Sequence, residues 1–109
     1  MKMQPILPPA HVEVDAARRY VEVDDAACEL LGYSRDELLQ MKIDDISAPS
    51  GAHVPPMFQL YSDKGELHGI FALRRKDGEV LRIRFESAIR DGRYRATWTH
   101  WEKWNPDTE

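Results

Sequence analysis

The segment GIFALRRKDGEVLRIRFESAIRDGRYRATWTHW, residues 69–101, decides the fold. Apolar and polar side chains alternate along three runs of this segment, and the runs are separated by the pairs Asp77-Gly78 and Asp91-Gly92. Alternation with a period of two is typical of half-buried strands, and an Asp-Gly pair is a strong signal of a hairpin turn. The segment therefore predicts three consecutive antiparallel strands.

The apolar pattern also predicts the register of both hairpins. A slip of one residue moves every side chain to the other face of the sheet, so apolar residues must pair with apolar residues. In the first hairpin this requires a three-residue loop with Gly78 in a left-handed conformation, which pairs Phe71 with Ile83. In the second hairpin a two-residue turn pairs Phe85 with Trp98.

The same register, continued to the end of the third strand, makes two further predictions. His100 should lie on the core face, opposite Ile83 and two residues after Trp98. Arg82 should lie on the other face, opposite Trp101, where we expect a cation–π contact worth about 0.5–1 kcal/mol if exposed.

The first half of the chain predicts two more strands and a short helix. Residues 11–15 and 20–24 both alternate with a period of two. Asp24 is suited to cap the start of the helix, because its carboxylate can accept a hydrogen bond from a free backbone N–H group. Gly32 can end the same helix in a left-handed conformation.

Three further helical segments are expected before the hairpins. Ser34 and Glu37 form the pattern of a capping box, in which each side chain accepts a hydrogen bond from the other residue's backbone. Ile43 and Ile46 suggest one more helical turn. A helix beginning near Pro56 would follow, because proline is favoured in the first turn of a helix.

Length and composition bound the organisation of the chain. One hydrophobic core fits in 109 residues, so we expect one domain over residues 11–104, with an extended leader at 1–10 and a polar tail at 105–109. The single cysteine, Cys28, excludes an intrachain disulfide and a cysteine-based metal cluster. No apolar run approaches 18 residues and no export signal is present, so we expect a cytoplasmic protein that does not enter a membrane.

Charge is distributed unevenly along the chain. The formal net charge is −4, but residues 74–95 hold eight basic and four acidic side chains, which makes this segment +4 and the remainder −8. Because acids interleave with the basic residues, we expect no nucleic-acid partner. The uneven charge is either an ordinary solvated strand face or the complementary surface of a dimer or partner contact.

Two segments, YVEVDDAACELLGYSRDEL at 20–38 and GIFALRRKDGEV at 69–80, resemble the PAS domain family. The resemblance covers about residues 11–101. It implies an α+β fold, a PAS-like five-stranded antiparallel sheet with short helices packed on one face. It also implies a sensory or interaction module without catalytic activity, which is often a dimer and sometimes holds a small molecule between helices and sheet.

Candidate pocket residues follow from the core face of the expected sheet. Small and large apolar side chains alternate there with few polar groups, as in small-molecule sites. The alternative is a closely packed core in which helix residues such as Leu30 and Leu38 fill the same space. The candidate residues are Phe71, Phe85, Ser87, Tyr94, Ala96, Trp98, His100 and Met57.

The sequence identifies no cofactor, and none is the leading expectation. A thiol–flavin photosensor needs a cysteine beside the flavin, whereas Cys28 falls on the first helix, where a packing role is expected. A haem sensor needs an axial histidine. His53 precedes the Pro56 helix and His68 should face outward, so haem is also disfavoured, and the histidines lack metal-ligand spacing.

The leading functional prediction is a PAS-type sensory and signal-transduction module. It would bind a small molecule or a protein partner and relay that state through a homodimer or to an effector protein acting in trans. The alternative is a ligand-free interaction or dimerisation module with a solid core. Neither reading makes the protein an enzyme, because no catalytic constellation is present.

Overall fold

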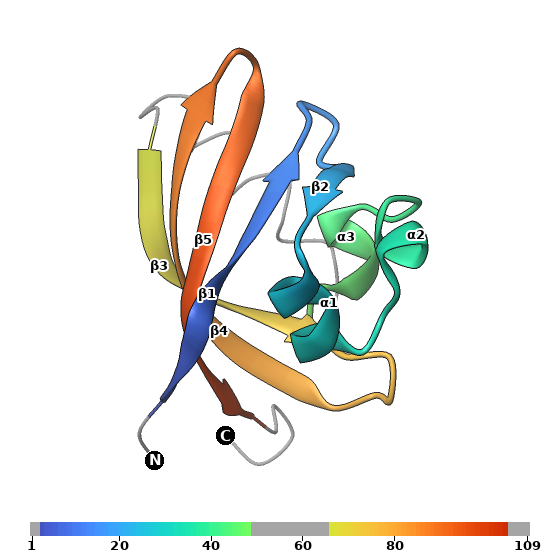
Figure 1. Ribbon diagram of the computed structural model, residues 1–109, viewed down its shortest axis with the longest axis vertical. Helices are drawn as coiled ribbons and strands as arrows, with labels where there is room; N and C mark the ends of the chain where they lie inside the picture. The colour runs from blue at the N-terminus through green and yellow to red at the C-terminus, as the bar shows by residue number, and fades with distance from the viewer. Residues whose placement is uncertain (1–2, 49–65, 105–109) are drawn as a thin grey trace.

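The computed structural model describes residues 3–48 and 66–104. The described elements form one five-stranded antiparallel sheet in the order β2-β1-β5-β4-β3, with three short helices gathered on one side of the curled sheet (Figure 1). The elements are β1 (Gln4–Val14), β2 (Tyr20–Val23), α1 (Asp25–Leu31), α2 (Arg35–Leu38), α3 (Ile43–Ile46), β3 (Glu66–Arg74), β4 (Val80–Arg90) and β5 (Arg93–Lys103). This arrangement confirms the expected fold class.

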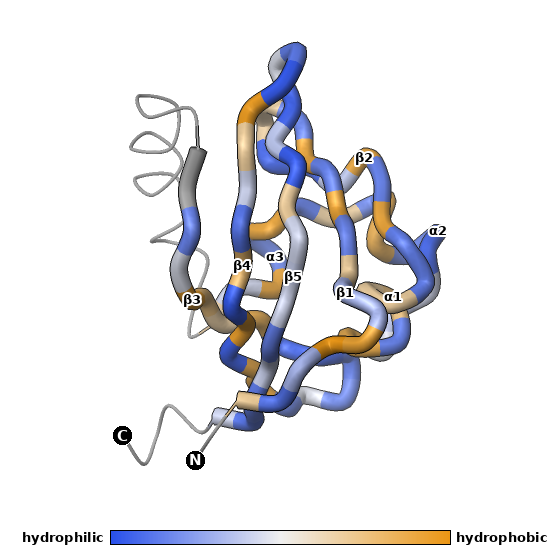
Figure 2. The backbone as a smooth tube through the Cα atoms, turned by 60° about the vertical axis from the view of Figure 1, so that its left-hand side comes forward, coloured by the Kyte–Doolittle hydropathy of each residue, from blue (hydrophilic) through white to orange (hydrophobic). Residues whose placement is uncertain are grey.

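Both hairpin registers are confirmed where the sequence pattern is strongest. Phe71 pairs with Ile83 between β3 and β4, and Gly78 has the expected left-handed backbone at φ +94°. Phe85 pairs with Trp98 between β4 and β5. Hydrophobic and hydrophilic residues therefore alternate along the strands (Figure 2), and the apolar set faces the helices.

The prediction for His100 is wrong. His100 pairs with Arg84, and Trp101 takes the place opposite Ile83. A bulge between Trp98 and His100 adds Thr99 to β5, which reverses the alternation beyond that point. The exchange is favourable, because it packs the larger and more apolar Trp101 against the core in place of an imidazole.

The same bulge changes the contacts of Arg82. Arg82 pairs with Glu102 rather than Trp101, and its Nε lies 3.5 Å from the Glu102 carboxylate. A cation–π contact does form, but with Trp104, whose ring centroid is 5.7 Å from the Arg82 guanidinium carbon. Arg82 is thus held by Glu102 of β5 and by Trp104, which directly follows this strand.

The first strand begins earlier than the alternation indicated. β1 starts at Gln4, so residues 4–10, expected as a leader, belong to the sheet. Gln4 pairs with Trp101 of β5, and the side chains of Ile6 and Ala10 are buried in the core. The register between β1 and β5 shifts between Pro5 and Ala10, since prolines cannot donate hydrogen bonds to a neighbouring strand.

Helix capping follows the sequence prediction. The Asp24 carboxylate accepts a hydrogen bond from the Ala27 amide, and Gly32 ends α1 at φ +79°. Ser34 and Glu37 form the capping box of α2. The helix expected near Pro56 lies outside the described residues. No helix in the described ranges is both long and apolar enough to cross a membrane.

The hairpin between β3 and β4 is fastened to the helices at its turn. The Lys76 amide donates to the carbonyl of Leu31 at 3.0 Å, and the Lys76 ammonium lies 2.8 Å from the Glu37 carboxylate. These bonds join the two segments that resemble the PAS family. They also close the end of the core where the helices meet the sheet.

We predict that Gly78→Ala lowers the free energy of unfolding by about 1 kcal/mol, because the left-handed backbone alone penalises a side chain there. A Cβ atom at Gly78 would meet no other atom within 4 Å, so no clash contributes. Gly69→Ala is the matched control, since its Cβ would make an ordinary contact 3.9 Å from Phe85. Urea unfolding of both variants tests this, and equal losses would contradict it.

Candidate functional site

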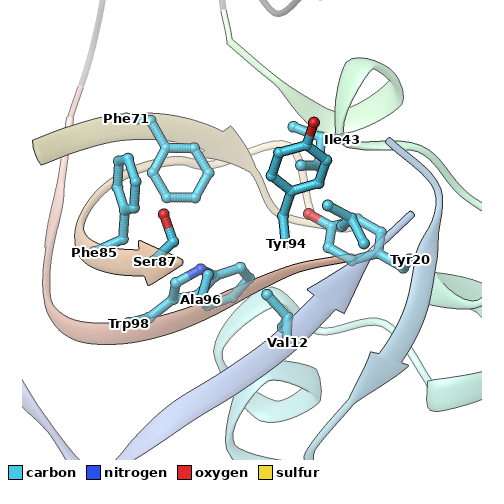
Figure 3. A pocket seen from close by; sticks show the side chains of 10 residues that line it. Val12, Tyr20, Ile43, Phe71, Phe85, Ser87, Tyr94, Ala96 and Trp98 are labelled. Atoms are coloured by element: carbon cyan, nitrogen blue, oxygen red, sulfur yellow. The ribbon is translucent and has the colours of Figure 1, made fainter. Parts of the chain in front are cut away.

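A small, partly open cavity of about 40 Å³ lies between the sheet and α3. Strands β1, β3, β4 and β5 line the cavity with side chains from their core faces. β2 and α3 each line it with their first residue. Figure 3 shows the side chains converging on this space from both sides. The lining residues are Val12, Val14, Tyr20, Ile43, Phe71, Phe85, Ser87, Tyr94, Ala96 and Trp98.

Six of the eight candidate residues line this cavity, because the confirmed register puts them on one face of β3, β4 and β5. They are Phe71, Phe85, Ser87, Tyr94, Ala96 and Trp98. His100 is not among the lining residues, because the bulge in β5 places it opposite Arg84. Met57 lies outside the described residues.

The aromatic wall of the cavity is ordered by edge-to-face contacts. The Phe71 and Phe85 ring centroids lie 5.0 Å apart at an interplanar angle of 82°, and Phe71 also meets Trp98 at 6.0 Å. Such arrangements are preferred because the positive edge of one ring meets the negative face of another. This wall is apolar apart from Ser87, which is engaged in an interaction of its own.

The opposite wall comes from residues that the sequence did not identify. They are Val12 and Val14 of β1, Tyr20 of β2 and Ile43 of α3. The alternation along both strands was a usable signal, since it placed Val12 and Val14 on one face. The alternation did not show where this face of β1 lies relative to the hairpins of β3, β4 and β5.

Tyr20 is the unusual residue of the site. Its side chain is 2% exposed, and its hydroxyl has no hydrogen-bond partner among the described residues. Burial raises the pKa of Tyr20 above its usual value, so the phenol is neutral. Figure 3 shows the hydroxyl end of the ring directed into the pocket, beside Tyr94. An unsatisfied buried hydroxyl costs about 1–3 kcal/mol, and the described residues supply no group that would offset this cost at Tyr20.

Tyr20 and Ile43 are held in place by a latch between the β1–β2 turn and α3. The Tyr20 amide donates to the Met41 carbonyl at 3.0 Å, and the Ile43 amide donates to the Arg18 carbonyl at 2.9 Å. The Arg18 guanidinium donates twice to Asp44, at 2.9 and 3.1 Å. This bidentate pair holds the pKa of Asp44 below its usual range.

No protein-family model matches the sequence, and no curated protein sequence matches it either. Solved structures do match the fold. A domain of a sensory box sensor histidine kinase/response regulator from Geobacter sulfurreducens has a TM-score of 0.72 at 21% identity, over 83% of this chain and 81% of that chain. The PAS domain of the fruit-fly ELK potassium channel has a TM-score of 0.67 at 20% identity, over 84% and 85%. The chain has a PAS fold.

A third PAS-fold neighbour is an RNA-binding light-oxygen-voltage receptor, with a TM-score of 0.68 at 20% identity over 87% of this chain and 29% of that chain. At these identities the comparisons establish the PAS fold alone.

Size and chemistry distinguish this cavity from a large cofactor pocket. Pockets for drug-sized ligands measure about 300–1,000 Å³, far more than the space in this PAS fold. Cys28, on α1, is not among the lining residues, and burial together with nearby Asp25 raises the pKa of its thiol. His68 is exposed on β3 and pairs with Glu86, as expected, whereas His53 lies outside the described residues.

We predict that Asp44→Asn destabilises the protein by about 1 kcal/mol at neutral pH, through loss of the ion pair with Arg18. Because the pKa of folded Asp44 lies below the unfolded value of 3.8, the contribution is complete above that value. It is lost as the pH falls through the lowered folded pKa.

Urea unfolding of the wild type and the variant at neutral and acidic pH measures this contribution. The gap should close in acid. Asp36→Asn is the matched control, because Asp36 is exposed on α2 and forms no ion pair with the described residues. An Asp44→Asn gap that persists unchanged in acid would contradict the latch.

Proposed function

We propose that the protein is a sensory signal-transduction module whose input is the binding of a small neutral molecule in the core cavity. The unpartnered Tyr20 hydroxyl carries this proposal, because it is a buried polar group in the wall of an apolar space. A ligand that accepts or donates one hydrogen bond there removes the cost of the unsatisfied hydroxyl. The PAS fold supports the sensory role, since structural neighbours include a sensor kinase domain.

The walls define the chemical class of the ligand. Apart from hydroxyl groups, the lining is aliphatic and aromatic. A charged ligand would lose its hydration without gaining a counter-ion, at a cost of several kcal/mol or more. We therefore propose an uncharged, mainly apolar molecule with one polar atom placed to meet the Tyr20 hydroxyl.

The volume limits the affinity of anything that fits without rearrangement. A cavity of about 150 Å³ holds benzene, and the space here is roughly a quarter of that. An occupant of one or two non-hydrogen atoms gains at most about 3 kcal/mol, which corresponds to a Kd of several millimolar. A tighter ligand is larger and displaces a wall, and we propose that it displaces the wall of Tyr20 and Ile43, which the Arg18–Asp44 latch holds.

Displacement of that wall would relay ligand binding from the cavity to the rest of the sheet. Tyr20 and Ile43 would move together with the β1–β2 turn, and β1 would transmit the change to β5 in the middle of the sheet. As part of this proposal, the output is a homodimer contact or an effector protein in trans. Catalysis plays no part, nucleic acid is not the ligand, and the setting is the cytoplasm.

The small volume also favours a second candidate function. A cavity of about 40 Å³ is close to the space of one water molecule, as in an ordinary packed core. In that case the domain is a ligand-free interaction or dimerisation module. The two candidates differ in the role of the Tyr20 hydroxyl.

We predict that Tyr20→Phe raises the stability of the unliganded protein by about 1 kcal/mol, because it removes an unsatisfied buried hydroxyl. The same variant should lose most of the thermal stabilisation given to the wild type by neutral hydroxylic probes from ethanol to phenol. Tyr94→Phe is the matched control, since Tyr94 lines the same cavity and has another partner. Probe responses that are absent in the wild type, or equal in wild type and Tyr20→Phe, would support the ligand-free candidate instead.

Ala96→Leu measures the space directly. Leucine adds three carbon atoms to a cavity of about 40 Å³, so we predict a loss of about 1–3 kcal/mol from overpacking. Ala88→Leu is the control, because Ala88 is partly exposed and lies outside the cavity. Calorimetric unfolding gives the comparison, and an Ala96→Leu protein as stable as the wild type would show a larger space than the structure describes.

A further inference from the structure

The face of the sheet opposite the cavity carries a row of arginines from β4 and β5. We call Arg84, Arg90, Arg93 and Arg95 the arginine face. All four are exposed, and the hairpin register places Arg90 directly opposite Arg93. Because like charges in directly opposed positions destabilise a strand pair, this arrangement is a local cost that the fold itself does not require.

The positive charge of the arginine face is only partly balanced within the chain. Arg93 and Arg95 both pair with Glu13 of β1, the Arg93 nitrogen at 3.4 Å from the carboxylate. The described residues supply no hydrogen bond or ion pair to the side chains of Arg84 and Arg90. Two guanidinium groups thus remain available to an outside acid, and two more share a single carboxylate.

An apolar contact lies within the same surface. Ile70 of β3 pairs directly with Arg84 and is 45% exposed, one of few large apolar side chains so exposed in the described ranges. Arginine is one of the residue types enriched at binding hot spots, and Ile70 adds an apolar contact beside it. The combination selects a partner with both carboxylates and apolar side chains.

We propose that the arginine face binds an acidic, partly apolar segment of a partner polypeptide. Arg84 and Arg90 lie six residues apart on β4, which corresponds to about 20 Å along the strand. A helix covers that distance with about 13 residues. The partner segment carries carboxylates toward both ends and an apolar side chain that contacts Ile70.

A polypeptide fits this surface better than RNA or a second copy. Glu86 lies on the same face of β4 between Arg84 and Arg90, where it would repel a continuous phosphate backbone. In a second copy, several acids of the helical layer are already engaged. Asp24 caps α1, Glu37 pairs with Lys76, and Asp44 pairs with Arg18.

Fluorescence anisotropy with the full chain tests the proposal. The probe is a fluorescein-labelled helical peptide of about 13 residues with Glu and Leu at helical spacing. The test variant is Arg84→Gln/Arg90→Gln. The control variant, Arg19→Gln/Arg35→Gln, removes the same charge from exposed positions before β2 and on α2, off the outer face of β3, β4 and β5.

We expect binding that weakens as salt is raised, a loss of about 10-fold or more in the test variant, and a change below about 2-fold in the control. Any of four results would overturn the proposal: no peptide binding at millimolar concentration, equal losses in both variants, tighter binding of a labelled single-stranded RNA, or protein self-association that the test variant abolishes. Tyr20→Phe should bind the peptide as the wild type does, so failure here is distinguishable from failure of the cavity proposal.

Discussion

The burial of Trp98 is the constraint on which the rest of the sheet depends. Its indole is 1% exposed, and it lies on β5, which pairs with β1 on one side and β4 on the other. Trp98 is opposite Ala10 in β1 and Phe85 in β4. A slip of one residue on β5 would turn this large side chain out to water, so its burial constrains the register with both neighbouring strands at once.

The sequence predicted the hairpins well because their registers depend on local alternation and two Asp-Gly turns. It failed at His100 for a physical reason: alternation there would expose Trp101, and a single bulged residue costs less than leaving the indole in water. The pairing of Gln4 with Trp101 joins residues nearly a chain length apart, and no local pattern contains it. Six cavity residues could be predicted because they lie on one face of β3, β4 and β5, whose registers follow from local alternation. Tyr20 and Ile43 could not, because contacts between distant segments bring them to the cavity.

The two proposed sites lie on opposite faces of the same strands. On β5 the cavity residues Tyr94 and Ala96 alternate with Arg93 and Arg95, and Arg95 contacts Glu13 of β1. A ligand that moves the Tyr20 wall acts on β1 and therefore on the carboxylate shared by two arginines of the outer face. The cavity and the arginine face are thus connected through β1 and β5 themselves.

The proposed input depends most directly on what occupies the space beside the Tyr20 hydroxyl. A crystal structure of the protein as isolated and after soaking with phenol shows what lies within hydrogen-bond distance of the Tyr20 oxygen. We expect a phenol hydroxyl there, with its ring among Phe71, Phe85 and Trp98 and a displaced Tyr20–Ile43 wall. A Tyr20 hydroxyl bonded only to one water or to the protein, in an unchanged core that excludes phenol, would contradict it.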